Sequence, residues 1–531
     1  MSTAIAGTPP LLRASLRHDG RLFAPWILIT TALSVSSVLV YPWIFPSEQD
    51  RTALATAIGA NPALGLIFGP AFDLSTTDGF NAWRSLALGG FLTALGVVFL
   101  VTRATRAQED SGQAELLASG VMGRAARLMA GVWMCLALSV VLGVVVGVVT
   151  ASCGGGWNAS MLLGATMAAT GWMFTGVAAI TAQLGSDVRT ANSLAVGTLG
   201  ALFVLRGVAY AMDAVDWTIW INPLGWMTQT KPAVENDWWP LLLAVVLTAV
   251  LLAVAFALQA RRDFGGGAVA PRPGPARGRE RSTLRLALRV NRAPLITWAL
   301  AFVGLGFVFG YFTTSIKGIL EDNPAVQHVL AAGATSPGEL ISAFVVTVLS
   351  LVGILAAIPG IQIMLKVRAE ELADRVEPLL AGSVPRARYY GGNVVIALLA
   401  PAVSLLLAGL LIATLASTAD IGVDFGDVVL QAAATIPAVW TVVAFSVFVI
   451  GARPQVLLAA WLGVLASFAL TLLGPTFKLW DGILAISPFW HVPNVTDESM
   501  DGMGLVWTSL VTLLFLVVGF AGFRRRDLAV S

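Results

Sequence analysis

Two segments of this chain carry charged residues in the same pattern and could bind a partner through ion pairs. The first, RAQEDSGQAELLASGVMGR, covers residues 106–124, and the second, RAEELADRVEPLLAGSVPR, covers residues 368–386. On a helix, residues three and four apart lie on one face and can pair. The segments align without gaps, and seven of their nineteen positions are identical: Arg106/Arg368, Ala107/Ala369, Glu109/Glu371, Glu115/Glu377, Leu117/Leu379, Gly120/Gly382 and Arg124/Arg386.

Elsewhere, the sequence contains no group of residues suited to metal binding, redox chemistry or nucleotide binding. The three histidines, His18, His328 and His491, fall in three different predicted loops, and Cys135 and Cys153 are too far apart along the chain for a disulfide. The four lysines precede Pro, Gly, Val and Leu, so none fits the phosphate-binding motif G-x-x-x-x-G-K-[ST]. We therefore expect no cofactor, metal or catalytic residue in this chain.

The elements that must position the charged segments are membrane spans. The chain has 531 residues, of which 57% are hydrophobic and only 12% charged, so its apolar surface must face lipid. A net charge of +2 provides no general attraction to nucleic acid. Since a span needs about 20 apolar residues, we predict twelve: 24–45, 85–102, 128–150, 161–183, 193–212, 239–258, 294–314, 339–365, 390–417, 427–450, 455–474 and 504–523.

The basic residues predict the orientation of these spans. Of the 32 Lys and Arg, 26 lie in the segments on the side of the two termini, five lie on the opposite side, and Arg206 lies within a span. Cytoplasmic loops are enriched in Lys and Arg, so both termini are predicted to be cytoplasmic in a bacterial inner (plasma) membrane. The first span is too long for a cleaved signal sequence.

The two halves of the chain repeat one design. Residues 1–262 form a first six-span half, 263–282 a basic flexible linker, and 283–531 a second six-span half. Besides the charged segments, three pairs of motifs match: 12–17 with 284–289, INP at 221–223 with ISP at 486–488, and ARRDF at 260–264 with RRRDL at 524–528. We predict an all-α polytopic protein of two tandem six-helix halves, related by a pseudo-twofold axis along the membrane normal.

The charged segments could serve either of two purposes. Each is longer than a connection between two spans requires, and its matched carboxylates favour docking of a partner. The alternative is a helix lying on lipid headgroups. Carboxylates make this alternative less favourable, because anionic lipids repel them. The amphipathic stretches 11–17 and 283–289 suit that lipid-surface role better, because their leucines and arginines lie on opposite faces.

The order of these features resembles the permease subunits of type-2 ATP-binding-cassette (ABC) exporters, and in particular actinobacterial tetronasin-type and multidrug-type permeases with two fused six-span halves. The resemblance covers the whole chain: basic surface stretch, two spans, charged segment, proline-bearing loop and closing R-R-D. It implies that the charged segment is a coupling helix that docks on the ATPase. The residues that match this helix are Arg106, Glu109, Gly112, Glu115, Arg124, Arg368, Glu371, Glu377 and Arg386. The second half departs from the pattern at Asp374 and Pro378, which makes unequal docking sites an open alternative.

The resemblance also implies the energy source and the cargo. A separate ATPase subunit, in two copies, would bind ATP and Mg²⁺, and spans lined mainly by Leu, Val, Ala, Gly and Phe suit lipophilic or amphipathic compounds. Arg206 either faces the substrate cavity or reaches the outer headgroups.

Two other functions remain as alternatives. One is an ion-coupled secondary multidrug transporter, although all 30 Asp and Glu lie in loops or at predicted span ends. The other is a membrane enzyme, for which the acidic residues and the histidine of the outer loops are weak candidates: Asp73, Asp78, Asp213, Asp216, Asp481 and His491.

Overall fold

The computed structural model is helical throughout the part of the chain that it describes. These residues are 5–59, 62–118, 122–212, 215–262, 266–267, 282–322, 337–382, 384–418, 424–473, 480–496 and 502–527. Twelve of its helical segments are long and apolar enough to cross a membrane, which confirms the predicted number: Gly20–Ile44, Thr77–Asp110, Ala126–Ser152, Trp157–Leu184, Val188–Tyr210, Pro240–Arg261, Thr283–Tyr311, Phe344–Leu372, Arg386–Thr418, Phe425–Ala452, Pro454–Thr471 and Met503–Arg525.

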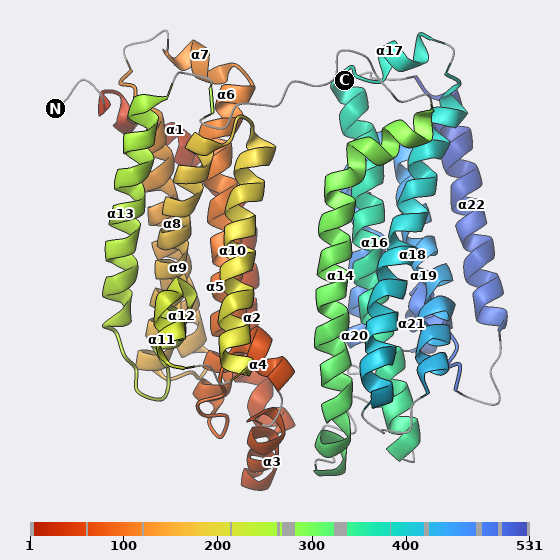
Figure 1. The fold of residues 1–531 in the computed structure, drawn as a ribbon, viewed down its shortest axis with the longest axis horizontal. Helices are drawn as coiled ribbons and strands as arrows, with labels where there is room; N and C mark the ends of the chain where they lie inside the picture. Colours follow the sequence, from red (N-terminus) through yellow and green to blue (C-terminus); the bar gives the residue numbers. More distant parts are fainter. Residues whose placement is uncertain are drawn as a thin grey trace. The chain divides into compact units, whose positions relative to one another are not determined.

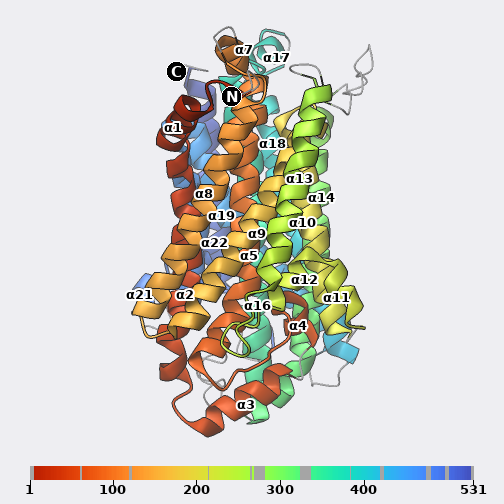
Figure 2. The same ribbon diagram turned by 90° about the vertical axis from the view of Figure 1, so that its left-hand side faces the viewer.

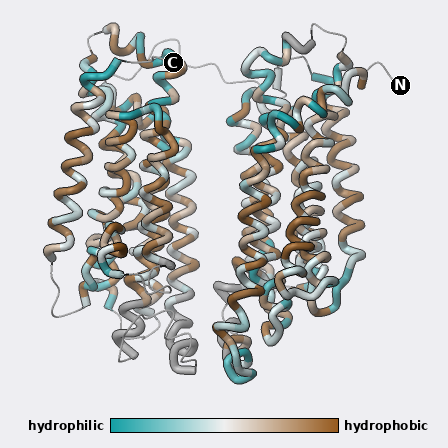
Figure 3. The backbone as a smooth tube through the Cα atoms, turned by 180° about the vertical axis from the view of Figure 1, so that it is seen from behind, coloured by the Kyte–Doolittle hydropathy of each residue, from teal (hydrophilic) through white to brown (hydrophobic). Residues whose placement is uncertain are grey.

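The chain divides into two compact units, Met1–Gly274 and Pro275–Ser531 (Figure 1). Each unit has its own buried apolar core. Of the predicted linker 263–282, only residues 266, 267 and 282 are described, so its boundaries stay a prediction. Figure 3 shows hydrophobic residues along the middle of the helices and hydrophilic ones near their ends. This distribution suits helices whose middle parts lie in lipid and whose ends lie in water.

Unit 1 is built around α9 (Trp157–Leu184), which packs against α5 (Thr77–Thr102), α8 (Ala126–Ser152) and α13 (Pro240–Arg261) (Figure 2). Glycine allows the close approach of α8 and α9, because a Cβ atom on Gly164 would lie only 2.1 Å from the carbonyl oxygen of Gly143. The other long helices are α2 (Ala24–Ile44) and α10 (Val188–Ala211). Shorter helices complete the unit: α1 (Thr8–His18), η2 (Gly20–Phe23), α3 (Glu48–Gly59), α4 (Pro62–Phe68), α11 (Trp217–Ile221) and α12 (Pro223–Thr228).

Unit 2 repeats the order of long helices: α14 (Thr283–Asp322), α16 (Pro337–Leu372), α18 (Arg386–Thr418), α19 (Phe425–Ala452), α20 (Leu462–Leu473) and α22 (Met503–Arg525). Helix α19 corresponds to α9 and packs against α16, α18 and α22. Short elements again join the long helices: α17 (Glu377–Leu380), η4 (Pro454–Trp461), α21 (Asp481–Leu484) and η5 (Pro488–His491).

The units differ at two of their spans. Residues 11–17 lie in the separate helix α1, whereas 283–289 form the first turns of the 40-residue helix α14, which contains Pro294 and bends in its upper part (Figure 1). The fifth span of unit 2 starts with the 3-10 helix η4, where Val456 has a non-helical conformation, while α10 of unit 1 is a regular α-helix. The repeat therefore preserves the order of elements more closely than their continuity.

The matching INP and ISP motifs have the same structural use. The Asn222 side chain accepts a hydrogen bond from the Leu224 N–H and caps α12, and the Ser487 hydroxyl accepts one from the Phe489 N–H and caps η5. In each motif the following proline occupies the first helical position, where its missing N–H costs nothing. The sequence repeat thus marks a repeated helix start.

Candidate functional site

The first charged segment continues directly from the second span. Helix α5 runs through a π-helical turn, η3 (Arg103–Ala107), into α6 (Gln108–Asp110), and a turn at Gly112 leads to α7 (Gln113–Ala118). Gly112 has a φ of +74°, a left-handed conformation that glycine adopts without strain. Its carbonyl oxygen accepts the Glu115 N–H at 3.1 Å. The chain therefore turns sharply at the end of the second span and places α7 at the tip of unit 1.

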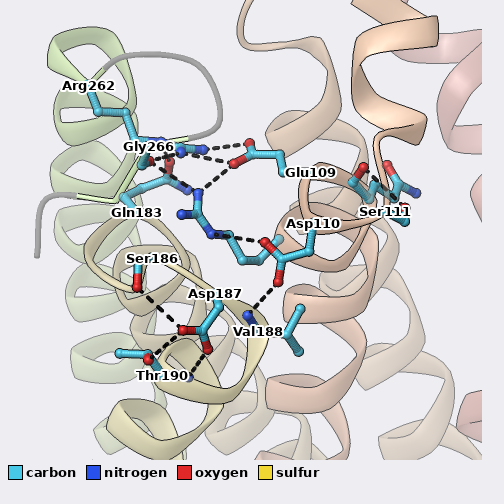
Figure 4. Close-up of polar contacts among 12 residues, drawn as sticks. Glu109, Asp110, Ser111, Gln183, Ser186, Asp187, Val188, Thr190, Arg262 and Gly266 are labelled. Atoms are coloured by element: carbon cyan, nitrogen blue, oxygen red, sulfur yellow. Dashed lines mark hydrogen bonds and ion pairs between the residues drawn. The ribbon is translucent and has the colours of Figure 1, made fainter. Parts of the chain in front are cut away.

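Glu109 lies at the centre of what we name the first cluster, which also contains Arg106, Arg127 and Arg262. Figure 4 shows Glu109 facing Arg262. Its carboxylate is 2.6 Å from Arg106 Nη1, contacts Arg127 Nη2, and accepts two hydrogen bonds from Arg262, at 2.6 and 2.9 Å. The Glu109 side chain is only 2% exposed and that of Arg106 is fully buried. Such charge-assisted hydrogen bonds are stronger than neutral ones, so α6 is held firmly to α8 and to the end of α13.

The first cluster also contacts α9 and the start of the linker. Arg262 Nε donates to Gln183 Oε1 of α9 at 2.6 Å, and both Arg106 and Arg262 donate to the carbonyl oxygen of Gly266. Arg124 in turn donates to the carbonyl oxygen of Arg262. The end of the second span is thereby joined to the third, fourth and sixth spans.

The adjacent Asp110 accepts a hydrogen bond from the start of the fifth span. Its carboxylate accepts the Val188 N–H at 2.8 Å, and Asp187 accepts the Thr190 N–H at 2.8 Å (Figure 4). Both N–H groups belong to the first turn of α10, which has no acceptors for them within the helix. The hydrogen bond from Thr190 lowers the pKa of the Asp187 carboxyl. Asp110 therefore ties α6 to the start of α10.

Unit 2 repeats this arrangement in the second cluster, which consists of Arg368, Glu371 and Arg526. Glu371 is fully buried and lies 2.9 Å from Arg368 Nη1 and 2.6 Å from Arg526 Nη2. Arg526 also donates to the Gly451 carbonyl at the end of α19 and stacks on Phe523. Arg386 donates to the Arg526 carbonyl at 2.8 Å, as Arg124 does to that of Arg262.

Comparison with known proteins agrees with this repeated plan. The family model for the ABC-2 type transporter matches residues 48–230, and the model for the C-terminal domain of the multidrug efflux system permease Rv1217c matches residues 281–524. The multidrug efflux system permease protein Rv1217c of Mycobacterium tuberculosis is 34% identical over 536 residues, which cover 99% of this chain and 96% of that protein. This chain is an ABC-2 type transporter permease. As a permease it is the membrane subunit of an ABC exporter, in which a partner subunit hydrolyses ATP.

The two clusters of the permease differ by a coordinated set of substitutions. The position of Arg127 is occupied by Tyr389, and that of Asp110 by Leu372. The fifth span of unit 2 begins with Pro454, which has no N–H, where unit 1 has Val188. Unit 2 therefore lacks both the carboxylate and the N–H that it would accept. Asp110 lies 3.9 Å from Arg106 Nε, and if it is counted with the first cluster, three arginines face two carboxylates there, while two arginines face one carboxylate in the second cluster. Each set then has one net positive charge.

The structure places seven of the nine predicted docking residues of the permease in two groups, while Arg124 and Arg386 bond to backbone carbonyls as described above. Arg106, Glu109, Arg368 and Glu371 are brought together with the arginines that end the sixth spans, and all four are buried. Arginines enclose both carboxylates, so Glu109 and Glu371 offer no exposed acid to a partner, and their docking role stays a prediction. Gly112 is partly exposed, and Glu115 and Glu377 are exposed. Asp374, the counterpart of Gly112, has a φ of +54°, so both segments make the same turn.

Arg262 and Arg526 are the functional candidates that sequence reasoning missed. The repeated R-R-D at the end of each half was a signal for them, but nothing local connects these arginines to glutamates 153 and 155 residues away. Burial of the glutamates was equally hidden, because an Arg–Glu pair three residues apart at a helix end has the pattern of an exposed surface pair.

Arg206 lies at the other end of unit 1 and is only 3% exposed. Its guanidinium donates to the Ile67 carbonyl at 2.7 Å, lies 3.4 Å from the Thr228 hydroxyl, and stacks on Phe203. These contacts join α10 to α4 and α12. They provide a structural reason for the lone arginine within a span, while its predicted place in a substrate cavity stays a prediction.

Proposed function

We propose that this permease exports lipophilic or amphipathic compounds and that its ATPase docks on α7 and α17. The observation that carries the proposal is the same in both units: a short helix with an exposed glutamate in its first turn follows the second span, and a buried arginine–glutamate cluster joins its base to several other spans. A buried charge network has few alternative arrangements, since breaking it leaves charges unpaired. A push on α7 or α17 would therefore move the joined helix ends together.

The exposed residues identify the contact surface. Glu115 and Glu377 occupy matching positions in the first turns of α7 and α17 and are exposed. They lie beside Gly112 and Asp374, respectively, whose shared turn sets the direction of the two helices. We propose that these residues contact the ATPase, while Arg106, Glu109, Arg124, Arg368, Glu371 and Arg386 position them.

The remaining features of the exporter follow from this assignment. Two docking helices suit two copies of the ATPase, which would hold ATP and Mg²⁺, and the permease itself would have no catalytic role. The distribution of Lys and Arg favours a cytoplasmic location for α7, α17 and both termini. The apolar lining of the spans supports a lipophilic cargo, as does the name of the Mycobacterium tuberculosis relative, a multidrug efflux system permease protein.

The position of the acidic residues in the described spans supports ATP rather than an ion gradient as the driving force. Every Asp and Glu in those spans lies within three residues of an end: Asp78, Glu109, Asp110, Glu370, Glu371 and Asp427. Ion-coupled transporters carry ionisable groups along the membrane path. No described span has a carboxylate in its middle part that could bind a coupling ion.

Charge reversal at the exposed positions tests the docking assignment. We would reconstitute the permease with its ATPase and measure ATPase stimulation and ATP-driven efflux for wild type and for the Glu115→Arg/Glu377→Arg variant. Glu48→Arg is the matched control, because Glu48 is an exposed glutamate of α3 at the opposite end of unit 1. We expect the double reversal to lower both activities at least tenfold and the control to leave them within twofold. Equal activity of all three proteins would disprove the docking assignment, and efflux by the permease alone under an ion gradient would disprove ATP coupling.

A further inference from the structure

Unit 2 contains a cavity that the docking function does not use. It has a volume of about 360 Å³ and lies between α19, α20 and α22, with residues 485–491 along one side. It is distant along these helices from the second cluster, which lies where α19 and α22 end. Small-molecule sites have volumes of about 300–1,000 Å³, so the cavity is large enough for a compact ligand.

The cavity wall is mainly apolar and rich in aromatic rings. Phe445, Trp507 and Phe515 line it, and the rings of Phe445 and Phe515 meet edge to face at 5.4 Å between centroids. Aromatic walls favour ligands that contain rings, because ring edges and faces have complementary charge. A saturated acyl chain would gain nothing from this property.

A few polar side chains also line the cavity and would fix the orientation of a ligand. His491 Nε2 lies 2.9 Å from the Ala485 carbonyl oxygen, which can only accept, so the neutral imidazole carries its proton on Nε2 and leaves Nδ1 as an acceptor. Among the described residues Nδ1 has no partner. The hydroxyls of Thr441 and Thr508 already donate to backbone carbonyls. His491 lines the cavity, so it offers the hydrogen-bond donor of a ligand an unused acceptor.

The cavity borders apolar surface on two helices that are predicted to span the membrane. Trp507 on α22 and Leu462 on α20 line the cavity, yet they are 60% and 55% exposed. Neighbouring residues of these helices, such as Leu465 and Leu510, are exposed as well. In a bilayer this surface suits lipid, so a lipophilic molecule dissolved in the membrane could reach the cavity sideways.

We infer that this cavity binds the cargo of the exporter: a compact lipophilic molecule with an aromatic ring and one hydrogen-bond donor, taken up from the bilayer. The inference rests on the proposed export function and specifies the class of its substrate. The rings of the ligand would lie among Phe445, Trp507 and Phe515, and its donor would bond to His491.

Binding of two matched probes tests this inference. N-phenyl-1-naphthylamine has aromatic rings and a single N–H donor, and 1-benzylnaphthalene has the same shape without the donor. Photoreactive derivatives of both would label the purified full-length permease in nanodiscs, with unlabelled probe as competitor and peptide mapping as readout. We expect saturable, competed labelling of α20 and α22 by both probes, with the amine binding about three- to tenfold more tightly, the value of one hydrogen bond.

Two variants locate the site. Ala466 lines the cavity, and Ala466→Trp should weaken binding of both probes at least tenfold, whereas Leu465→Trp, an exposed neighbour outside the cavity, should change it less than twofold. His491→Phe should remove the preference for the amine and retain binding of the hydrocarbon. This second variant keeps the inference testable if Ala466→Trp does not fold.

The outcomes separate the cavity from the export function. Labelling that is not saturable, or that Ala466→Trp does not reduce, would overturn the inference even if ATP-driven efflux is intact. A tightly held phospholipid that neither probe displaces would overturn it too. The inference would be supported if Ala466→Trp weakens probe binding and also reduces ATP-driven efflux of the amine by the reconstituted complex. Binding without any ATP-driven efflux by wild type would instead disprove the proposed function and leave the cavity a ligand site.

Discussion

Replacing Glu109 by glutamine is the most direct perturbation of the first cluster. The variant keeps the size and shape of the side chain but removes its charge, and it places an amide NH₂ among guanidinium groups that can only donate. Arg106 is fully buried, and Arg127 and Arg262 are each 11% exposed. Removing one partner of a buried ion pair costs about 3–5 kcal/mol. Because two of the arginines keep some contact with water, we expect a loss of about 3 kcal/mol, the lower end of that range.

This loss should be visible in the thermal stability of the purified permease. At about 2–4 °C for each kcal/mol in units of about 150–250 residues, the melting temperature should fall by about 6–12 °C. Glu115→Gln is the matched control, because Glu115 is exposed on the neighbouring helix α7, and surface substitutions change stability by about 0.5 kcal/mol or less. The assay is the fraction of monodisperse permease that survives heating in detergent.

A double-mutant cycle identifies the cause of the loss. Glu109→Gln combined with Arg262→Gln should be less destabilising than the sum of the single variants, because the second change removes one unpaired charge. The reasoning would be refuted if Glu109→Gln melted within 2 °C of the Glu115→Gln control, or if the two changes were simply additive.

Three further predictions use differences between the two units. Gly112→Asp should be tolerated, because Asp374 makes the same left-handed turn, whereas Gly112→Val should lower stability by about 1–2 kcal/mol in the same melting assay. Asp110→Leu should destabilise by about 1–3 kcal/mol because it leaves the Val188 N–H without its acceptor. Adding Val188→Pro, the residue type of the second unit, should recover most of that loss, and no recovery would contradict the assignment. Because the pKa of Asp187 is lowered in the folded protein, its contribution to the free energy of unfolding is present above about pH 4 and is lost as the pH falls below that value. Asp187→Asn, which can still cap α10, should therefore flatten the acid side of the stability profile, and an unchanged profile would contradict this.

Much of the fold could be predicted from the sequence because each span is marked by its own composition. All twelve predicted spans coincide with helices long and apolar enough to cross a membrane, since about 20 consecutive apolar residues have few alternatives to a membrane helix. The repeat at residues 106–124 and 368–386 was equally visible, and its two turns have matching backbones. The continuity of α14 was not predictable, because Pro294 can either end a helix or only bend it, and packing decides which.

The candidate site was less accessible to sequence reasoning because its contacts join residues that are far apart in the chain. The arginine at the end of each sixth span contacts a glutamate at the end of the second span, and the sequence between them contains the third to sixth spans and their connections. A carboxylate at a helix end is equally compatible with water, lipid headgroups or a partner. In the fold, the ends of α13 and α22 lie against the ends of α6 and α16, so arginines rather than water or lipid surround these carboxylates.

The measurement that tests the central claim most directly is cross-linking from the tips of α7 and α17 to the ATPase. Glu115→Cys and Glu377→Cys would be introduced separately into a permease whose Cys135 and Cys153 have been replaced, with Glu48→Cys as the control. We predict that each tip forms a cross-link to an ATPase subunit in an active complex, and that the control forms none. An actively exporting complex in which neither tip cross-links would contradict the account.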